Sequence, residues 1–184
     1  MERAERDRMC RHLSQSRELL RQAVRGLSAE QRSFRPAADR WSVADCIEHL
    51  TVVENFTVTR IQQLLEQPPA AQPDTSGKDQ IIVDHVPVPT TRVKGPAAVM
   101  PSGRWADFDE LLSQFEAARQ RSIGFIETTQ ADLRAYAFPH PFLGPLDCYQ
   151  WLLFLATHCE RHVRQMEEVK NEAAFPGQVG SAIA

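Results

Sequence analysis

The feature that most constrains the fold of this 184-residue chain is a proline-rich stretch at residues 67–104, which lies between segments of helical periodicity. It holds seven of the twelve prolines, and proline removes an amide donor and fixes φ. We therefore expect no regular element there beyond a short extended piece at residues 81–83. A connection this long is typical of bundles in which consecutive helices run in the same direction.

Apolar residues recur at helical spacing on both sides of this stretch. Serine-led capping boxes predict a short helical turn at residues 28–31 and the start of a long helix at residue 43. A turn at residues 129–133 and a second proline-rich link at 134–145 precede the last helical segment. The pattern predicts an all-α four-helix bundle, with helices at about 5–25, 43–66, 104–128 and 146–171.

The length fits one domain spanning residues 1–184, with a frayed tail from about residue 173. The longest apolar run, residues 151–156, is far shorter than the roughly 20 residues of a membrane helix. The N-terminus is charged where a signal peptide would be apolar. We therefore expect a cytoplasmic protein that does not enter a membrane.

The net charge argues against nucleic acid as a partner, and the cysteine spacing argues against disulfides and a cysteine metal site. The net charge of −3 offers no global field for nucleic acid, and the arginines of the first helix are expected to form a solvated stripe. The four cysteines contain no Cys-x-x-Cys pair, so we expect reduced thiols in the core.

Three of the six histidines fall where a bundle would bury them. His158 and His162 are four residues apart on the apolar face of the last helix, and His49 lies on the apolar side of the second helix, near Phe56. Buried neutral histidines bonded to carbonyl groups are one interpretation. The other is a metal site, because unsatisfied buried imidazole atoms cost about 1–3 kcal/mol each and a divalent ion takes three lone pairs at once.

Three imidazole ligands would leave a coordination position open for water or a thiolate, as in catalytic sites. The nearby acids Asp45, Glu48 and Glu160 are interpreted as ordinary helix carboxylates, so no catalytic residue is assigned. His140, between two prolines, is expected either to overhang one end of the bundle or to be exposed.

Three motifs together resemble the DinB-like superfamily of metal-dependent enzymes: WSVADCIEHL at 41–50, HPFLGPL at 140–146 and HCERHVRQ at 158–165. The resemblance covers residues 41–165. It implies a four-helix bundle in up-down-down-up order, with a long crossover between helices two and three. It also implies a divalent metal, Zn²⁺ or Ni²⁺, held by His49, His158 and His162. Similar proteins include transferases that use bacillithiol or mycothiol.

The function hypothesis is therefore a metal-dependent hydrolase or a low-molecular-weight-thiol S-transferase, acting on a small molecule with a thiol as its cofactor. The alternative is a binding or dimerisation bundle, a homodimer with a structural metal. A fourth side-chain ligand, such as Asp45 or Cys46, would favour the structural alternative. Nucleic-acid binding through the first helix is a third hypothesis, and the charge disfavours it.

Overall fold

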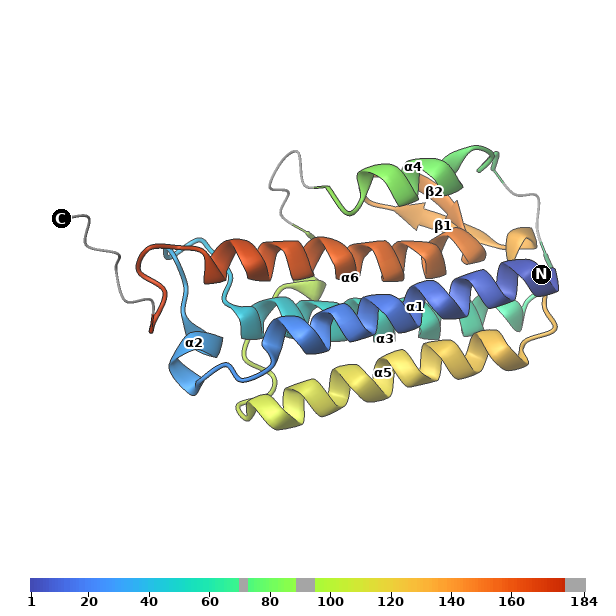
Figure 1. Cartoon of the computed structure of the whole chain (residues 1–184). Helices are drawn as coiled ribbons and strands as arrows, with labels where there is room; N and C mark the ends of the chain where they lie inside the picture. The colour runs from blue at the N-terminus through green and yellow to red at the C-terminus, as the bar shows by residue number, and fades with distance from the viewer. Residues whose placement is uncertain (70–72, 89–94, 178–184) are drawn as a thin grey trace.

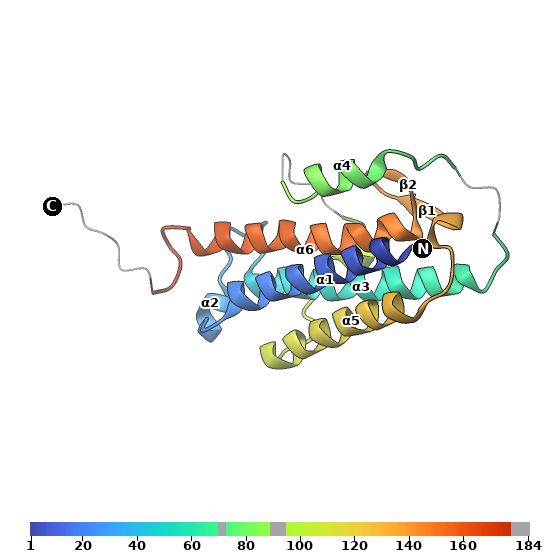
Figure 2. The same ribbon diagram turned by 45° about the vertical axis from the view of Figure 1, so that its right-hand side comes forward.

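The computed structural model describes residues 1–69, 73–88 and 95–177, and four long helices form its body (Figure 1). The chain direction, followed by colour in Figures 1 and 2, is the same in α1 and α6 and opposite in α3 and α5. The two helices of each pair pack against each other, and the pairs are joined by contacts of α1 with α5 and of α3 with α6. The predicted four-helix bundle and its up-down-down-up order are confirmed, with α1 at Arg3–Val24, α3 at Val43–Leu65, α5 at Phe108–Thr128 and α6 at Cys148–Lys170.

Both predicted capping boxes are present. The Ser42 hydroxyl accepts the Asp45 amide at 3.1 Å, and the Asp45 carboxylate accepts the Ser42 amide at 2.8 Å, which fixes the start of α3. Ser28 and Gln31 make the same exchange at the start of α2, Ala29–Ser33. Such caps stabilise a helix end by about 1 kcal/mol each. They fix where α3 begins, and so where His49 lies along the bundle.

The crossover contains a helix where the sequence predicted an extended piece. Residues 81–83 lie within α4, Lys78–His85, and a turn of 3-10 helix, η1, follows at Ala97–Val99. Gly77 precedes α4 at a φ of 76°, which favours glycine. Ile82 is fully buried and α4 packs on α6. The extended piece was a wrong prediction, because packing on α6 stabilises a helix too short to show clear periodicity.

The second proline-rich link also has regular structure. After η2, Leu133–Ala135, the chain forms an antiparallel hairpin of β1, Ala137–His140, and β2, Gly144–Asp147. Pro139 lies directly opposite Pro145. Two prolines can face each other in this way at a non-hydrogen-bonded pair, where neither amide is needed. The hairpin and α4 lie together beside the N-terminal half of α6 (Figures 1 and 2), and the sheet is a minor addition to an all-helical fold.

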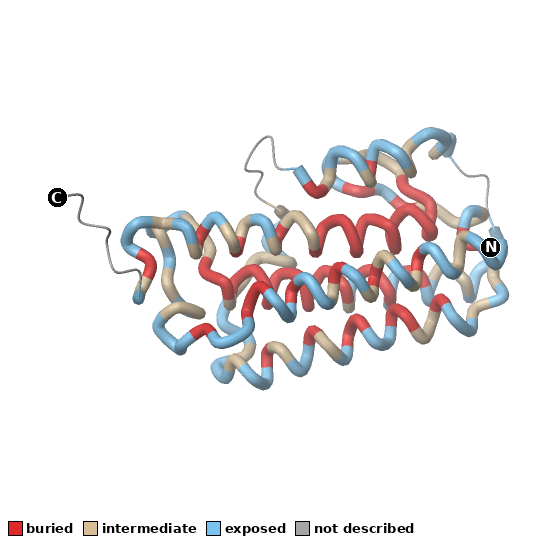
Figure 3. The backbone as a smooth tube through the Cα atoms, in the orientation of Figure 1, coloured by how far each residue is buried: buried red, intermediate tan, exposed pale blue. Residues whose placement is uncertain are grey.

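Burial follows this arrangement. The N-terminal half of α6 is buried almost continuously (Figure 3), because the bundle covers one side and α4 with the hairpin covers the other. Midway along the bundle, Arg119 of α5 and Glu54 of α3 form a bidentate ion pair at 2.7 and 2.8 Å, and they are 0% and 1% exposed. Phe56, expected on the inner side of α3, is instead exposed.

The cysteines and the chain end complete the description. All four cysteines are unpaired, and three of them are buried, as expected for core thiols. Phe175 packs edge-on against Phe34 with ring centroids 5.6 Å apart, while much of the expected frayed tail lies outside the described residues. Across the described part of the chain, no helix has the length and apolar character needed to cross a bilayer.

Candidate metal centre

Three histidines from two antiparallel helices meet inside the bundle. His49 comes from the second turn of α3, and His158 and His162 come from successive turns of α6. The Nε2 atom of His158 is 3.3 Å from Nε2 of His49 and 3.0 Å from Nε2 of His162. All three side chains are at most 9% exposed. The structure therefore brings together the three residues that the sequence singled out.

Hydrogen bonds on the far side of two of the rings fix their tautomers. His49 Nδ1 donates to the Val99 carbonyl at 2.8 Å, and His162 Nδ1 donates to Gln165 Oε1 at 3.0 Å. With a proton on Nδ1, each neutral ring presents a bare lone pair at Nε2. His158 Nδ1 is buried and, within the described residues, has no partner.

Burial also keeps the three rings neutral. It lowers the pKa of His49, although the hydrogen bond to the Val99 carbonyl acts in the opposite direction. Burial lowers the pKa of His158 and His162 well below the ordinary value of 6.5, and the neighbouring histidines lower both further. Neutral imidazole is the form that binds a metal ion.

The separation of the three lone pairs fits a divalent ion. Ligands about 2.0–2.1 Å from a tetrahedral ion lie about 3.3 Å from one another, close to the 3.0 and 3.3 Å found here. Without an ion, His158 Nε2–H can donate to the Nε2 lone pair of either His49 or His162. The other of these two lone pairs then remains without a donor. The donor set therefore suits a borderline metal ion such as Zn²⁺ or Ni²⁺.

The end of the crossover is fastened beside the cluster. The Glu48 carboxylate accepts the backbone amides of Ser102 and Gly103 at 2.8 and 2.9 Å, and Arg104 Nη1 donates to it at 2.6 Å. Burial disfavours the ionised form of Glu48, but these hydrogen bonds outweigh burial and lower its pKa. The fastened segment carries Val99, the acceptor for His49. Glu48, expected to be a solvated carboxylate, is thus buried and structural.

Aromatic rings form the sides of the cluster. Trp41 stacks on His162 with ring centroids 5.6 Å apart and contacts His49 at 4.9 Å. Phe154 stacks on His158 at 4.7 Å. These contacts restrict how the imidazoles rotate, and together with the outer hydrogen bonds they hold the three rings in place.

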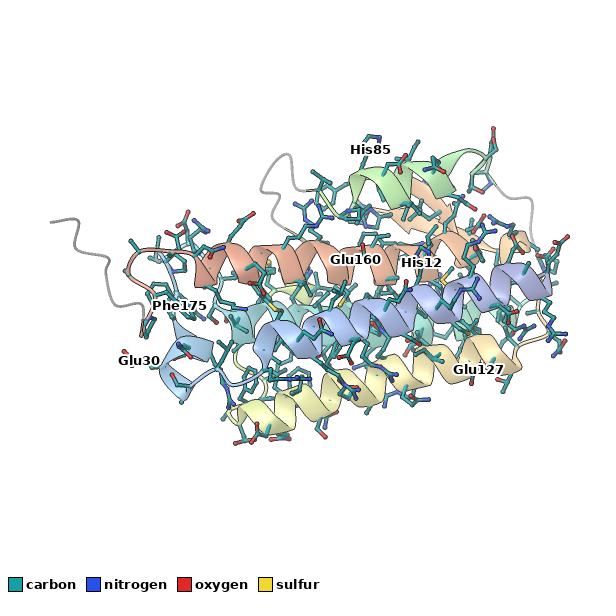
Figure 4. All side chains as sticks on the ribbon, viewed as in Figure 1. His12, Glu30, His85, Glu127, Glu160 and Phe175 are labelled. Carbon is teal, nitrogen blue, oxygen red and sulfur yellow. The ribbon has the colours of Figure 1, made fainter. Side chains whose placement is uncertain are left out.

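The described part of the chain offers no fourth side-chain ligand at this point. The cluster of potential ligand atoms within 4.8 Å of one another consists of the three histidines. Asp45 is engaged by Ser42 and by the Arg35 guanidinium at 2.8 Å. Cys46 is fully buried, which raises the pKa of its thiol. Glu160, on α6 (Figure 4), is half-buried and outside the cluster.

Of the three histidines outside the cluster, His12 is half-buried on α1, and the other two differ sharply in exposure. His85 points away from the bundle on the outer side of α4 (Figure 4), and it is exposed. His140, for which the sequence favoured exposure, is 8% exposed and packs on Phe154 with ring centroids 4.5 Å apart. The hairpin accounts for the difference, because it folds the proline-flanked segment back onto α6.

Sequence reasoning missed the groups that surround the cluster. Val99 and Gln165 act through hydrogen bonds that depend on the folded arrangement, and Val99 uses a backbone atom that any residue has. Gln165 is three residues after His162, so helical spacing was an available indication. Trp41 was noted only as the first residue of a motif, and Phe154 only as part of the apolar run at residues 151–156.

The fold and the cluster define a class of protein: residues 12–166 match the DinB superfamily, and the chain belongs to that family. The uncharacterised protein YuaE of Bacillus subtilis (strain 168) is 21% identical over 149 residues, which cover 81% of this chain and 89% of YuaE. The solved structure of YfiT from Bacillus subtilis is similar in fold, with a TM-score of 0.63, 16% identity and coverage of 92% of this chain and 88% of that one. YfiT is described as a probable metal-dependent hydrolase with an unusual four-helix bundle topology.

Proposed function

We propose that this protein is a metal-dependent enzyme in which His49, His158 and His162 hold a divalent ion, Zn²⁺ or Ni²⁺. The reaction we propose is hydrolysis of a small molecule or transfer of a low-molecular-weight thiol to one. The observation that carries the proposal is the convergence of three Nε2 atoms, two of them on rings that a Val99 or Gln165 oxygen holds from behind. Membership of the DinB superfamily and the description of YfiT are consistent with it.

An ion held by three neutral imidazoles keeps its full charge and supplies Lewis-acid chemistry to whatever occupies its free positions. The chain's own residues orient the ligands and restrict access. Val99 and Gln165 fix the tautomers of two rings, and Trp41 and Phe154 cover ring faces. Apolar surroundings strengthen electrostatic interactions at such a site.

Catalysis is favoured over the structural alternative by the donor set. Structural zinc sites are closed by four side chains, whereas catalytic sites keep a position free. The described residues bring three potential ligands together, and Asp45 is already held by Arg35 and Ser42. We therefore favour an enzyme over a homodimeric binding bundle.

The metal is tested by elemental analysis of protein purified without a nickel column. We expect about one divalent ion per chain in the wild type and in the His85→Ala control, which changes an exposed histidine, and none in His158→Ala. Equal metal content in wild type and His158→Ala overturns the proposed site.

The reaction class is tested by screening metal-loaded protein against two substrate sets. One set combines low-molecular-weight thiols with small electrophiles, and the other consists of simple esters and amides. Turnover that His158→Ala abolishes identifies the class. A metal-loaded protein that is silent in both sets supports the structural alternative.

A further inference from the structure

A second polar group with a fixed donor lies one aromatic ring away from the three histidines. His140 is the last residue of β1, where it pairs with Gly144, and its ring contacts Phe154 at 4.5 Å between centroids. Phe154 stacks in turn on His158 at 4.7 Å. Phe154 and His158 occupy successive turns of α6. His140 therefore lies next to an aromatic ring that itself contacts one of the three clustered histidines.

The hairpin turn determines which nitrogen of His140 carries the proton. Nδ1 accepts the backbone amides of Phe142 at 3.2 Å and Leu143 at 3.1 Å, so it has no proton of its own. Burial lowers the pKa of His140 to about 4, and the ring is neutral near pH 7. A neutral imidazole that accepts at Nδ1 is a donor at Nε2.

That donor has no acceptor within the described residues, where the hydrogen bonds of the ring are the two at Nδ1. The residue is 8% exposed, so the described part of the chain does not enclose it completely. An oriented N–H group without a protein acceptor beside an apolar wall is typical of groups that orient ligands.

We propose that His140 is a substrate-binding residue whose Nε2–H donates to an oxygen of a small molecule bound through another atom at the three-histidine centre. This inference rests on the proposed function. The ligand class is a molecule with two oxygen-bearing groups, such as two carboxylates or a carboxylate and a carbonyl. A short apolar segment between these groups lies against Phe154.

The test uses full-length protein loaded with Co²⁺, whose visible spectrum reports ligand binding without requiring turnover. The probes are succinate, which has a second carboxylate, and butyrate, which has the same chain length and lacks it. We expect wild type to bind succinate about tenfold more tightly than butyrate, the range for a hydrogen bond to a charged acceptor.

Two variants separate the two nitrogens of the ring. His140→Asn keeps a short side-chain acceptor for the turn amides and removes the donor, so we expect the preference for succinate to disappear while butyrate binds as before. His140→Gln places an amide nitrogen near the Nε2 position, and retained preference there supports the proposal. Loss of preference in both variants with unchanged butyrate affinity also supports it, because Asn preserves the turn.

Three outcomes overturn the proposal. The wild type shows no preference for succinate over butyrate, or His140→Asn keeps that preference. In the third, His140→Asn loses affinity for butyrate as well as for succinate, which indicates a structural role for His140. These outcomes require a Co²⁺ spectrum that His158→Ala abolishes. If that spectrum is absent, the proposed metal site itself fails, and the inference fails with it.

Discussion

Glu48 and His49 are neighbours on α3, and they hold the same segment of the crossover through different groups. The Glu48 carboxylate binds the amides of Ser102 and Gly103, and the His49 imidazole binds the carbonyl of Val99. The connection between α3 and α5 is therefore part of the site rather than a covering over it. Its last residues set the orientation of one proposed ligand.

Glu48→Gln is expected to weaken metal binding about tenfold, because outer partners of this kind change metal affinity by about 10- to 100-fold. The amide is a poorer acceptor for Arg104 and the two loop amides, so Val99 is less firmly held against His49. Competition against a chromophoric chelator measures the affinity. Glu66→Gln, an exposed position at the other end of α3, is the matched control and should bind as wild type does.

The ion pair between Arg119 and Glu54 gives a prediction on stability. Arg119→Met leaves the Glu54 carboxylate buried without its partner, and breaking a buried pair from one side costs about 3–5 kcal/mol. The double variant with Glu54→Leu removes the stranded charge and should recover most of that loss. Urea unfolding followed by circular dichroism measures both.

Arg121→Met provides the control for this pair, because Arg121 is exposed and its bond is to Asn55. We expect it to lie within about 0.5 kcal/mol of wild type. If the double variant is no more stable than Arg119→Met, the unpaired charge of Glu54 is not the cause of the destabilisation, and the loss of the ion pair itself accounts for it.

His158→Leu is expected to abolish metal binding without lowering the stability of the metal-free protein. The buried Nδ1 of His158 has no partner among the described residues, and an unsatisfied buried polar atom costs about 1–3 kcal/mol. Leucine is apolar and can pack on Phe154. The free energy of unfolding of the apo variant should equal or exceed that of apo wild type, and a loss above about 1 kcal/mol would contradict this account.

The buried histidines predict how stability depends on pH. Histidine in the unfolded chain takes up a proton near pH 6.5, whereas burial lowers the pKa of His140 to about 4 and that of His158 and His162 well below 6.5. Between about pH 6.5 and 4 the unfolded state binds more protons, so the free energy of unfolding falls as the pH falls.

Urea titrations of metal-free protein at a series of pH values measure this slope. His158→Leu, with one buried histidine fewer, should show a shallower decline than wild type. An unfolding free energy that stays constant from pH 7 to pH 5 would be inconsistent with neutral buried rings.

The sequence predicted the bundle because its determinants are local. Apolar spacing and the box between Ser42 and Asp45 specify α3 without tertiary contacts, and four-residue spacing alone puts His158 and His162 on one face. The helix α4 could not be predicted in this way, since it is short and depends on burying Ile82. The hairpin could not be predicted either, because Pro139 and Pro145 lack amide donors and therefore indicated a loop. Only the strand register shows that the two prolines lie opposite each other, at a pair where no amide hydrogen bond is needed.

The three converging imidazoles also connect metal loading to the order of assembly. His49 and His158 are 109 residues apart in sequence, so an unfolded chain offers an ion at most the local pair on the last helix. High-affinity capture then requires α3 and α6 to be docked and the end of the crossover to be in place beside His49. An ion that binds in this way stabilises only the finished structure, and its retention would report that assembly is complete.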